Sequence, residues 1–402
     1  MGMNQTPASE RIHIGFFGRR NAGKSSVMNA VTGQDLSVVS EVKGTTTDPV
    51  YKAMELLPLG PVVLIDTPGI DDEGELGDQR VKKSYQVLNK TDVALLIIDD
   101  RVGKTKEDQQ LLERFQKKKI PYLIVHNKMD LGNQEEKTGS HDIWVSAKTG
   151  AHIYELKEAI AKLQVQEESK QRIVGDLLTP SDFVILVIPI DESAPKGRLI
   201  LPQQQTIRDI LESNAVAIAV KENELSETLR KLGTKPKMVI TDSQVFQKVA
   251  TETPKDIWLT SFSILFARYK GDLLTVAQGA KALDHLKDGD TILISEGCTH
   301  HRQCNDIGTV KIPGWIQKYT GKQIALEFTA GTEFPEDLSK YGLIVHCGGC
   351  MLNEREMKYR IQCAEDQGIP ITNYGILIAY IQGILKRSVE PFSDIVEALQ
   401  ET

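Results

Sequence analysis

Residues 12–33, IHIGFFGRRNAGKSSVMNAVTG, decide the fold of the first third of the chain. The mostly apolar run at residues 12–17 predicts a strand, and apolar residues spaced through 27–31 predict a helix. Between them, residues 18–25 match the pattern G-x-x-x-x-G-K-[ST] at every fixed position. Strand, loop and helix follow in the order that the pattern requires, so the stretch predicts a loop that binds phosphate groups.

The residue types in this loop suit that chemistry. Glycines let backbone N–H groups close around the phosphates, and the start of the helix adds a favourable dipole. We expect Lys24 to reach the β- and γ-phosphates and the Ser25 hydroxyl to bind Mg²⁺. The predicted nucleotide contacts in the loop are Gly18, Asn21, Ala22, Gly23, Lys24, Ser25 and Ser26.

Further apolar runs predict strands at residues 62–65, 93–98, 122–125 and 143–145. Continuous apolar strands are typical of a parallel sheet that helices cover on both faces. The first of these runs ends in Asp66-Thr67-Pro68-Gly69. An acid at the tip of a buried strand can hold Mg²⁺ through water, and the N–H of Gly69 can sense the γ-phosphate.

Two short motifs after later strands indicate the base of the nucleotide. Asn127-Lys128-Met129-Asp130 follows the third run, and Ser146-Ala147-Lys148 follows the last. The Asp130 carboxylate can accept hydrogen bonds from N1–H and the exocyclic amine of guanine. Adenine presents an acceptor at N1 and would leave buried polar groups unpaired, so the motif predicts guanine specificity.

In these motifs and their order, residues 11 to about 165 resemble the small GTPases of the bacterial TrmE–Era–Der group: GRRNAGKSS, GTTTDP, DTPG, NKMD and SAK. The resemblance implies that Thr46 is the switch threonine on Mg²⁺, with Thr45 as the near alternative. It also implies that Asn21 helps to hold a K⁺ ion, which would neutralise transition-state charge. Lys24, Thr46 and Gly69 are then the catalytic group.

Ile70 follows DTPG, where Ras-like proteins carry a glutamine that orients water. Its apolar side chain cannot do so. Either an acid within residues 71–78 orients the water, or hydrolysis is intrinsically slow. We therefore expect a GTPase that is slow and stimulated by K⁺ over Na⁺.

Length and composition limit the remaining possibilities. A chain of 402 residues suggests two or three domains, and a net charge of -7 argues mildly against a nucleic-acid partner. No stretch approaches the roughly 18 apolar residues of a membrane helix, and residues 1–10 lack a signal core and are interpreted as a mobile tail. We therefore expect a cytoplasmic protein with no membrane contact. All five cysteines lie in the last 105 residues, so one domain holds the thiol chemistry.

Residues 178–266 alternate between β-prone and helical segments, which predicts a second α/β unit with a parallel or mixed sheet. This stretch carries no metal, acid-pair or nucleophile motif. Its function is self-association or simple spacing.

The last part of the chain brings thiols and imidazoles to two predicted strand ends. Cys298 and His300 follow one strand, and His346, Cys347 and Cys350 follow another after 45 residues, in the stretch HCGGC. Such strand ends are where α/β folds build sites. The spacing alone fits a zinc site, a redox pair or an iron–sulfur cluster with one exchangeable ligand.

C-x-H, a gap and H-C-x-x-C, placed behind a GTPase domain, resemble the HydF family of FeFe-hydrogenase maturation GTPases across the whole chain. The resemblance implies an α/β protein with a GTP-binding domain (11–170), a dimerisation domain (178–266) and a cluster domain (267–402). It implies a 4Fe-4S cluster on Cys298, Cys347 and Cys350. His300 and His346 are either a fourth ligand or hydrogen-bond donors to the ligands. Cys304 and Cys363 stay unassigned.

The same resemblance implies a homodimeric scaffold that carries a transient diiron precursor from radical-SAM maturation enzymes to apo FeFe-hydrogenase. GTP turnover would regulate partner release. One alternative is a GTPase acting on RNA with a structural zinc site, which the acidic balance and an aromatic content of 6% disfavour. Another is a redox-sensing GTPase that uses CGGC.

Overall fold

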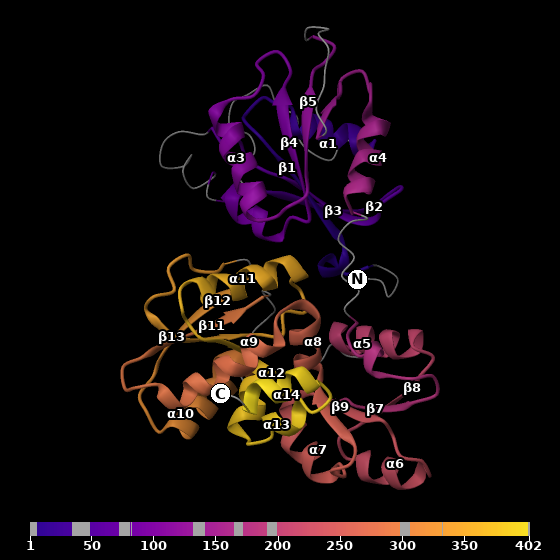
Figure 1. The fold of residues 1–402 in the computed structure, drawn as a ribbon, viewed down its shortest axis with the longest axis vertical. Coiled ribbons are helices and arrows are strands. Elements are labelled where there is room, and N and C mark those ends of the chain that lie inside the picture. Colours follow the sequence, from indigo (N-terminus) through magenta and orange to yellow (C-terminus); the bar gives the residue numbers. More distant parts are fainter. Residues whose placement is uncertain are drawn as a thin grey trace. The chain divides into compact units, whose positions relative to one another are not determined.

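The computed structural model describes residues 6–33, 49–71, 81, 83–131, 141–164, 172–190, 199–297, 306–331 and 333–400. The chain divides into two compact units, Met1–Ser169 and Lys170–Thr402, and each is described by itself (Figure 1).

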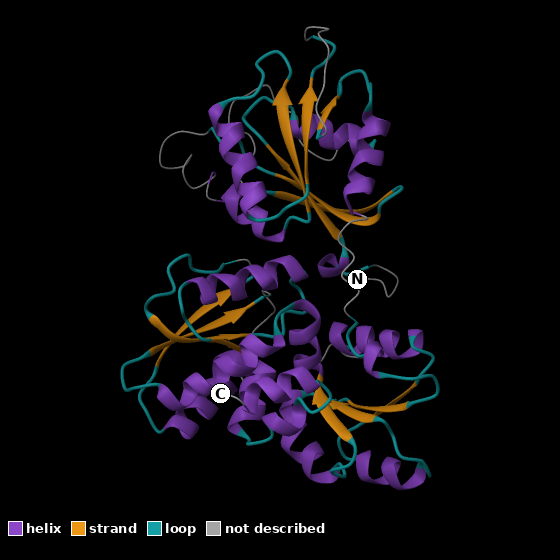
Figure 2. Ribbon diagram, viewed as in Figure 1, coloured by secondary structure: helices purple, strands orange, loops and turns teal. Residues whose placement is uncertain are grey.

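The first unit is a six-stranded sheet with helices on both faces (Figure 2). Its longer elements are β1 (Ile12–Phe17), α1 (Lys24–Thr32), β2 (Val50–Leu56), β3 (Gly60–Asp66), β4 (Val93–Asp99), α3 (Lys106–Lys117), β5 (Tyr122–Asn127), β6 (Asp142–Trp144) and α4 (Ile153–Gln164). The order is β2-β3-β1-β4-β5-β6, and only β2 runs antiparallel to its neighbour. The expected parallel arrangement of the five apolar runs is confirmed, and β2 adds an edge strand that the sequence did not predict.

The central strand β4 explains why the apolar runs are continuous. All seven of its residues are buried, because helices cover both of its faces. Leu95 belongs to the core that contains α1 and α4, whereas Leu96 belongs to the core that contains α3. The parallel strands β1, β3, β4 and β5 all end at one edge of the sheet, and this edge carries the sequence motifs.

The second unit contains two four-stranded sheets, and all of the strands in each are parallel. The first has the order β10-β9-β7-β8. Its elements are β7 (Phe183–Val187), α5 (Leu201–Glu212), β8 (Val216–Val220), α6 (Leu225–Lys231), β9 (Met238–Thr241), α7 (Phe246–Glu252), β10 (Trp258–Ser261) and α8 (Phe262–Lys270). The predicted alternation of strand and helix is confirmed.

The second sheet has the order β12-β11-β13-β14. Its elements are α9 (Leu273–Gly279), β11 (Thr291–Glu296), α10 (Ile312–Thr320), β12 (Ala325–Ala330), β13 (Tyr341–His346), α11 (Glu354–Asp366), β14 (Ile371–Asn373), α12 (Tyr374–Ile381), α13 (Leu385–Ser388) and α14 (Ser393–Gln400), with a short π-helix, η6, at Ile307–Lys311. One hydrophobic core joins the two sheets, since it contains β7 and β9 together with Leu293 of β11 and Ile344 of β13.

No helix among the described residues is long and apolar enough to cross a membrane.

Candidate functional site

The phosphate-binding loop connects β1 to α1, as the sequence predicts. Lys24 is buried, and its Nζ donates to the carbonyl oxygens of Gly18 (3.0 Å) and Arg19 (2.9 Å). Gly18 and Gly23 both have positive φ angles, +137° and +91°, which side-chain-bearing residues rarely adopt. The loop therefore already has the curvature that lets backbone N–H groups face a phosphate.

Asn127, at the end of β5, joins three of the predicted motifs. Its Nδ2 donates to the Ala22 carbonyl (3.1 Å), and its Oδ1 accepts from the Ala147 N–H (3.1 Å). A Cβ on Gly23 would lie 2.2 Å from that Nδ2, so only glycine leaves room for the side chain. The structure thus brings NKMD and SAK against the phosphate-binding loop.

Lys128 and Asp130 line a cavity of about 670 Å³ beside α1, together with Ser26, Asn29, Ala147 and Lys148 among others. The Ser146 hydroxyl donates to Asp130 Oδ1 (2.7 Å), which holds the carboxylate at the cavity. Lys128 Nζ donates to the Asn21 carbonyl (2.6 Å) and pairs with Asp99 Oδ2 (2.7 Å). This cavity brings together the residues that the sequence assigns to guanine.

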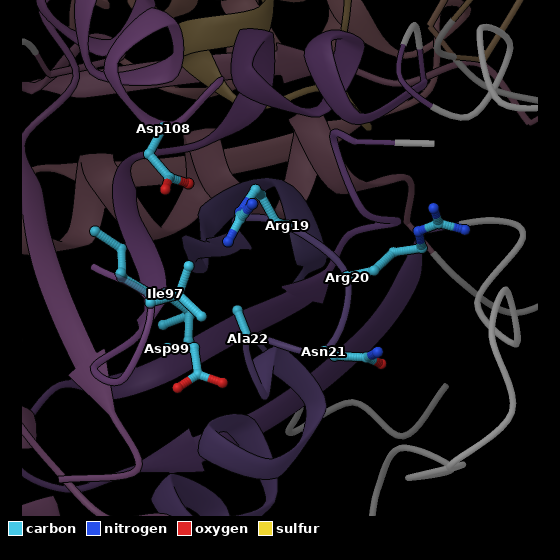
Figure 3. A pocket seen from close by; sticks show the side chains of 9 residues that line it. Arg19, Arg20, Asn21, Ala22, Ile97, Asp99 and Asp108 are labelled. Atoms are coloured by element: carbon cyan, nitrogen blue, oxygen red, sulfur yellow. The ribbon is translucent and has the colours of Figure 1, made fainter. Parts of the chain in front are cut away.

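Asp99, the last residue of β4, was not predicted as a site residue. Hydrogen bonds from Arg101, and then Lys128, hold the pKa of its carboxyl well below its usual range. Figure 3 shows Arg19 between Asp99 and Asp108 around a second, smaller cavity of about 120 Å³. The sequence signal that could have identified Asp99 was its position at the end of a predicted buried strand.

The DTPG segment lies against the same loop. The Ser25 hydroxyl donates to Asp66 Oδ2 (2.5 Å), so the two predicted Mg²⁺ groups are adjacent. A hydroxyl and a carboxylate fit Mg²⁺, which prefers oxygen ligands. A Cβ on Gly69 would meet Arg20 Cγ at 2.4 Å. Asp71 Oδ1 accepts from the Arg20 N–H (2.7 Å).

Four of the predicted site residues lie outside the described residues: Thr45, Thr46, Cys298 and His300. Cys304 and the acids at residues 72–78 also do. No group of three or more His, Cys, Asp and Glu side chains that could hold a metal ion occurs among the residues that the structure describes.

The thiol loop, residues 347–353, begins where β13 ends. Strands β11 and β13 are parallel neighbours, with Ser295 opposite His346, so the segment that leads to Cys298 ends beside Cys347. Cys347 Sγ accepts from the N–H groups of Gly297 (3.0 Å) and Gly349 (3.4 Å). Backbone donors directed at a sulfur stabilise a thiolate, which is the form that binds metal. The described part of the donor set therefore fits an iron–sulfur cluster.

His346 is 1% exposed, and both of its ring nitrogens have partners. Its Nδ1 lies 2.7 Å from the Cys347 carbonyl oxygen, and its Nε2 lies 2.9 Å from an Nη of Arg360. Because Arg360 can only donate, Nε2 is the acceptor and the ring proton is on Nδ1. Burial first, and then the charge of Arg360, lower the His346 pKa to about 3. This geometry is that of a supporting group for Cys347 rather than of a ligand.

Arg360, on α11, is fully buried and was missed by the sequence analysis. It pairs with Glu356 (3.0 Å), and it donates to Ser295 Oγ (3.1 Å) and to the Gly331 carbonyl (2.8 Å). The i,i+4 spacing of Glu356 and Arg360 was visible in the sequence. Their burial was not.

Cys350 completes the described thiols of the loop. Burial raises the pKa of its thiol, and the nearby Lys270 ammonium opposes that shift. Gly349 has a φ of +62°, and a Cβ there would meet Met357 Sδ at 2.6 Å, so the loop needs glycine at this position.

Three family models match the chain. Residues 13–128 match the 50S ribosome-binding GTPase, residues 173–271 the hydrogen maturase F dimerization domain, and residues 274–391 the hydrogen maturase F tetramerization domain.

Among curated proteins, the chain is 36% identical over 158 residues to the tRNA modification GTPase MnmE of Nitrosomonas eutropha, covering 38% of this chain and 35% of that protein. It is 34% identical over 158 residues to MnmE of Legionella pneumophila (strain Corby), with the same shares. The chain thus spans about a third of the length of these relatives. A solved structure of a variant of Aquifex aeolicus Era bound to GDP and aluminium fluoride is 21% identical, covers 55% of this chain and 98% of that one, and has a TM-score of 0.35.

The two hydrogen maturase F models follow a GTPase model along one chain, and the chain belongs to the hydrogen maturase F family of GTPases.

Proposed function

We propose that this protein is a GTP-hydrolysing scaffold that holds a 4Fe-4S cluster, carries a diiron precursor and delivers it to apo FeFe-hydrogenase. The observation that supports this most is the joint presence of a phosphate-binding loop and a two-thiol loop beside a strand that leads to a third cysteine. Family models named for hydrogen maturase F cover the part of the chain that holds the thiols.

Hydrolysis of GTP would take place at the edge where β1, β3, β4 and β5 end. Lys24, which donates to the carbonyl groups of Gly18 and Arg19, would exchange these bonds for bonds to the β- and γ-phosphates. Ser25 and Asp66, with Thr46 or Thr45 from the switch segment, would hold Mg²⁺, which offsets phosphate charge when it is bound. The Gly69 N–H would report whether a γ-phosphate is present, and Asp130 would select guanine.

The rate of hydrolysis depends on groups other than Ile70. This side chain is 7% exposed and belongs to the core that contains α3, so it cannot position a water molecule. We propose that turnover is slow and that K⁺ held near Asn21 supplies the missing positive charge. Asn21 is exposed on the phosphate-binding loop, where a cation would lie beside the phosphates.

The cluster would be held by the thiolates of Cys298, Cys347 and Cys350. His346 would support Cys347 through its ring N–H, and His300 stays a proposed fourth ligand. Three thiolates leave one iron with an exchangeable ligand, which is the position where another molecule can attach. The protein would act as a homodimer with radical-SAM maturation enzymes as donors, and the nucleotide state would regulate partner release.

Action on RNA is the weaker proposal. The similarity to tRNA modification GTPases covers only 38% of this chain, whereas residues 173–271 and 274–391 match the hydrogen maturase models.

Two measurements on a Lys24→Ala variant test the division of labour. We expect GTP turnover to be lost, while the absorption and EPR spectra of the anaerobically reconstituted cluster stay those of the wild type. Lys52→Ala, which changes an exposed lysine of β2, is the control and should keep both. Loss of the cluster together with turnover in Lys24→Ala would contradict separate sites.

A further inference from the structure

A buried lysine reaches the thiol loop from the other sheet of its unit. Lys270 is the last residue of α8 and is 2% exposed. Burying an ammonium group costs free energy unless it is hydrogen-bonded, so the Lys270 Nζ needs acceptors close by. Residues 173–271 match the dimerization domain, whereas the thiol loop lies within the tetramerization match at 274–391. Lys270 therefore belongs to the region that matches one family domain and contacts a loop in the region that matches the other.

Lys270 donates to two backbone carbonyl groups of the thiol loop. Its Nζ donates to the carbonyl oxygen of Leu352 (3.0 Å) and to that of Cys350 (3.4 Å). Its Nζ also lies over the Phe266 ring, 5.7 Å from the ring centroid. The Lys270 ammonium group thus holds the second half of the thiol loop through two of its carbonyl groups.

The held segment also contacts the strand end that leads to Cys298. A Cβ on Gly297 would lie 2.7 Å from Leu352 Cγ, so the Leu352 side chain packs directly on Gly297. The Gly297 N–H donates to Cys347 Sγ, and the Leu352 N–H donates to the Gly349 carbonyl (3.0 Å). A shift of Leu352 would therefore disturb the contacts at the ends of both β11 and β13, which bring the thiols together.

We propose that Lys270 is a positioning residue for the cluster: it anchors the thiol loop and fixes a positive charge beside Cys350, which makes a cluster bound there easier to reduce. The inference rests on the cluster proposed above. An iron–sulfur cluster gains negative charge when it accepts an electron, and a buried cation stabilises that charge more than a solvated one does.

The proposed cluster site takes residues from the regions that match both family domains. The site that holds the cluster is incomplete without α8, because the anchoring charge comes from the region that matches the dimerization domain. The region that matches the tetramerization domain supplies the thiols of HCGGC but not this charge.

The test is a redox titration of the anaerobically reconstituted full-length protein, followed by EPR of the reduced cluster. At the midpoint potential of the wild type, we expect Lys270→Met to have about a tenfold lower ratio of reduced to oxidised cluster. For a one-electron couple this ratio corresponds to a midpoint about 59 mV more negative. Lys318→Met, which removes an exposed lysine from α10, makes the same change in net charge and should leave the midpoint unchanged.

Lys270→Gln keeps an amide donor but removes the charge, and it gives the same readout if methionine prevents folding. A folded Lys270→Met or Lys270→Gln protein with a wild-type midpoint would overturn the inference. A wild-type protein that binds no iron and sulfide would instead overturn the proposed cluster, so the two failures are distinguishable.

Discussion

The buried pair of Arg360 and Glu356 gives the sharpest prediction about stability. Their side chains are 0% and 5% exposed, and the guanidinium group also serves His346, Ser295 and the Gly331 carbonyl. Arg360→Met would leave the Glu356 carboxylate buried without its cation. Removal of one partner of a buried pair costs about 3–5 kcal/mol, and we expect a loss of that size in the free energy of unfolding of the second unit.

A second substitution separates the two contributions. Adding Glu356→Gln removes the stranded charge and should recover about 1–2 kcal/mol. The remaining loss comes from the acceptors on His346, Ser295 and Gly331, each of which loses a donor worth about 1 kcal/mol. Lys358→Met, on the same helix, breaks an exposed i,i+4 pair with Glu354 and should cost less than about 0.5 kcal/mol.

Urea unfolding of the cluster-free protein measures these values. In a Trp144→Phe background, the remaining tryptophans, Trp258 and Trp315, both lie in the second unit, so their emission reports its transition alone. The reasoning is refuted if Arg360→Met costs no more than Lys358→Met, or if the double variant is no more stable than the single one.

Three further changes test other parts of the structure. Gly23→Ala places a Cβ 2.2 Å from Asn127 Nδ2, at a φ of +91°. The backbone strain and the lost hydrogen bond of Asn127 together cost about 2–3 kcal/mol. Calorimetry should therefore show about 30- to 160-fold weaker GTP binding, and an unchanged affinity would contradict this reasoning. Asn21→Ala should remove the stimulation of GTP turnover by K⁺ over Na⁺, whereas equal rates in both salts for the wild type would exclude a K⁺ site. Burial lowers the His346 pKa from 6.5 to about 3. Below pH 6.5 the unfolded chain therefore binds a proton at His346 that the folded protein does not bind, and the free energy of unfolding decreases as the pH falls. Between pH 7.5 and 5.5 the cluster-free wild type should lose about 1.4 kcal/mol more than His346→Gln, and equal losses would show that the histidine is not buried as a neutral group.

Much of the first unit could be predicted because its motifs have fixed spacing at strand ends. The run at residues 93–98 predicts a buried strand from composition alone, and the structure extends it by one residue to Asp99. The antiparallel strand β2 could not be predicted in the same way. Five of its seven residues are exposed and only Leu56 is buried, so its place follows from pairing with β3 rather than from an apolar pattern of its own.

The site around the thiols depends on contacts between distant parts of the chain. The thiols form a local motif and were predicted, but Lys270 and Leu352 are 82 residues apart and no spacing rule connects them. Arg360 and His346 are 14 residues apart across a strand-to-helix turn, and only the fold brings them within 2.9 Å. The roles of Thr46, Cys298 and His300 stay predictions.

Metal and sulfide analysis of the protein purified without oxygen tests the scaffold function most directly. We predict iron and acid-labile sulfide in equal amounts, an EPR signal of a reduced 4Fe-4S cluster, and loss of all three in Cys347→Ala. Stoichiometric zinc without sulfide would contradict the proposal and would favour a structural metal site behind the GTPase domain.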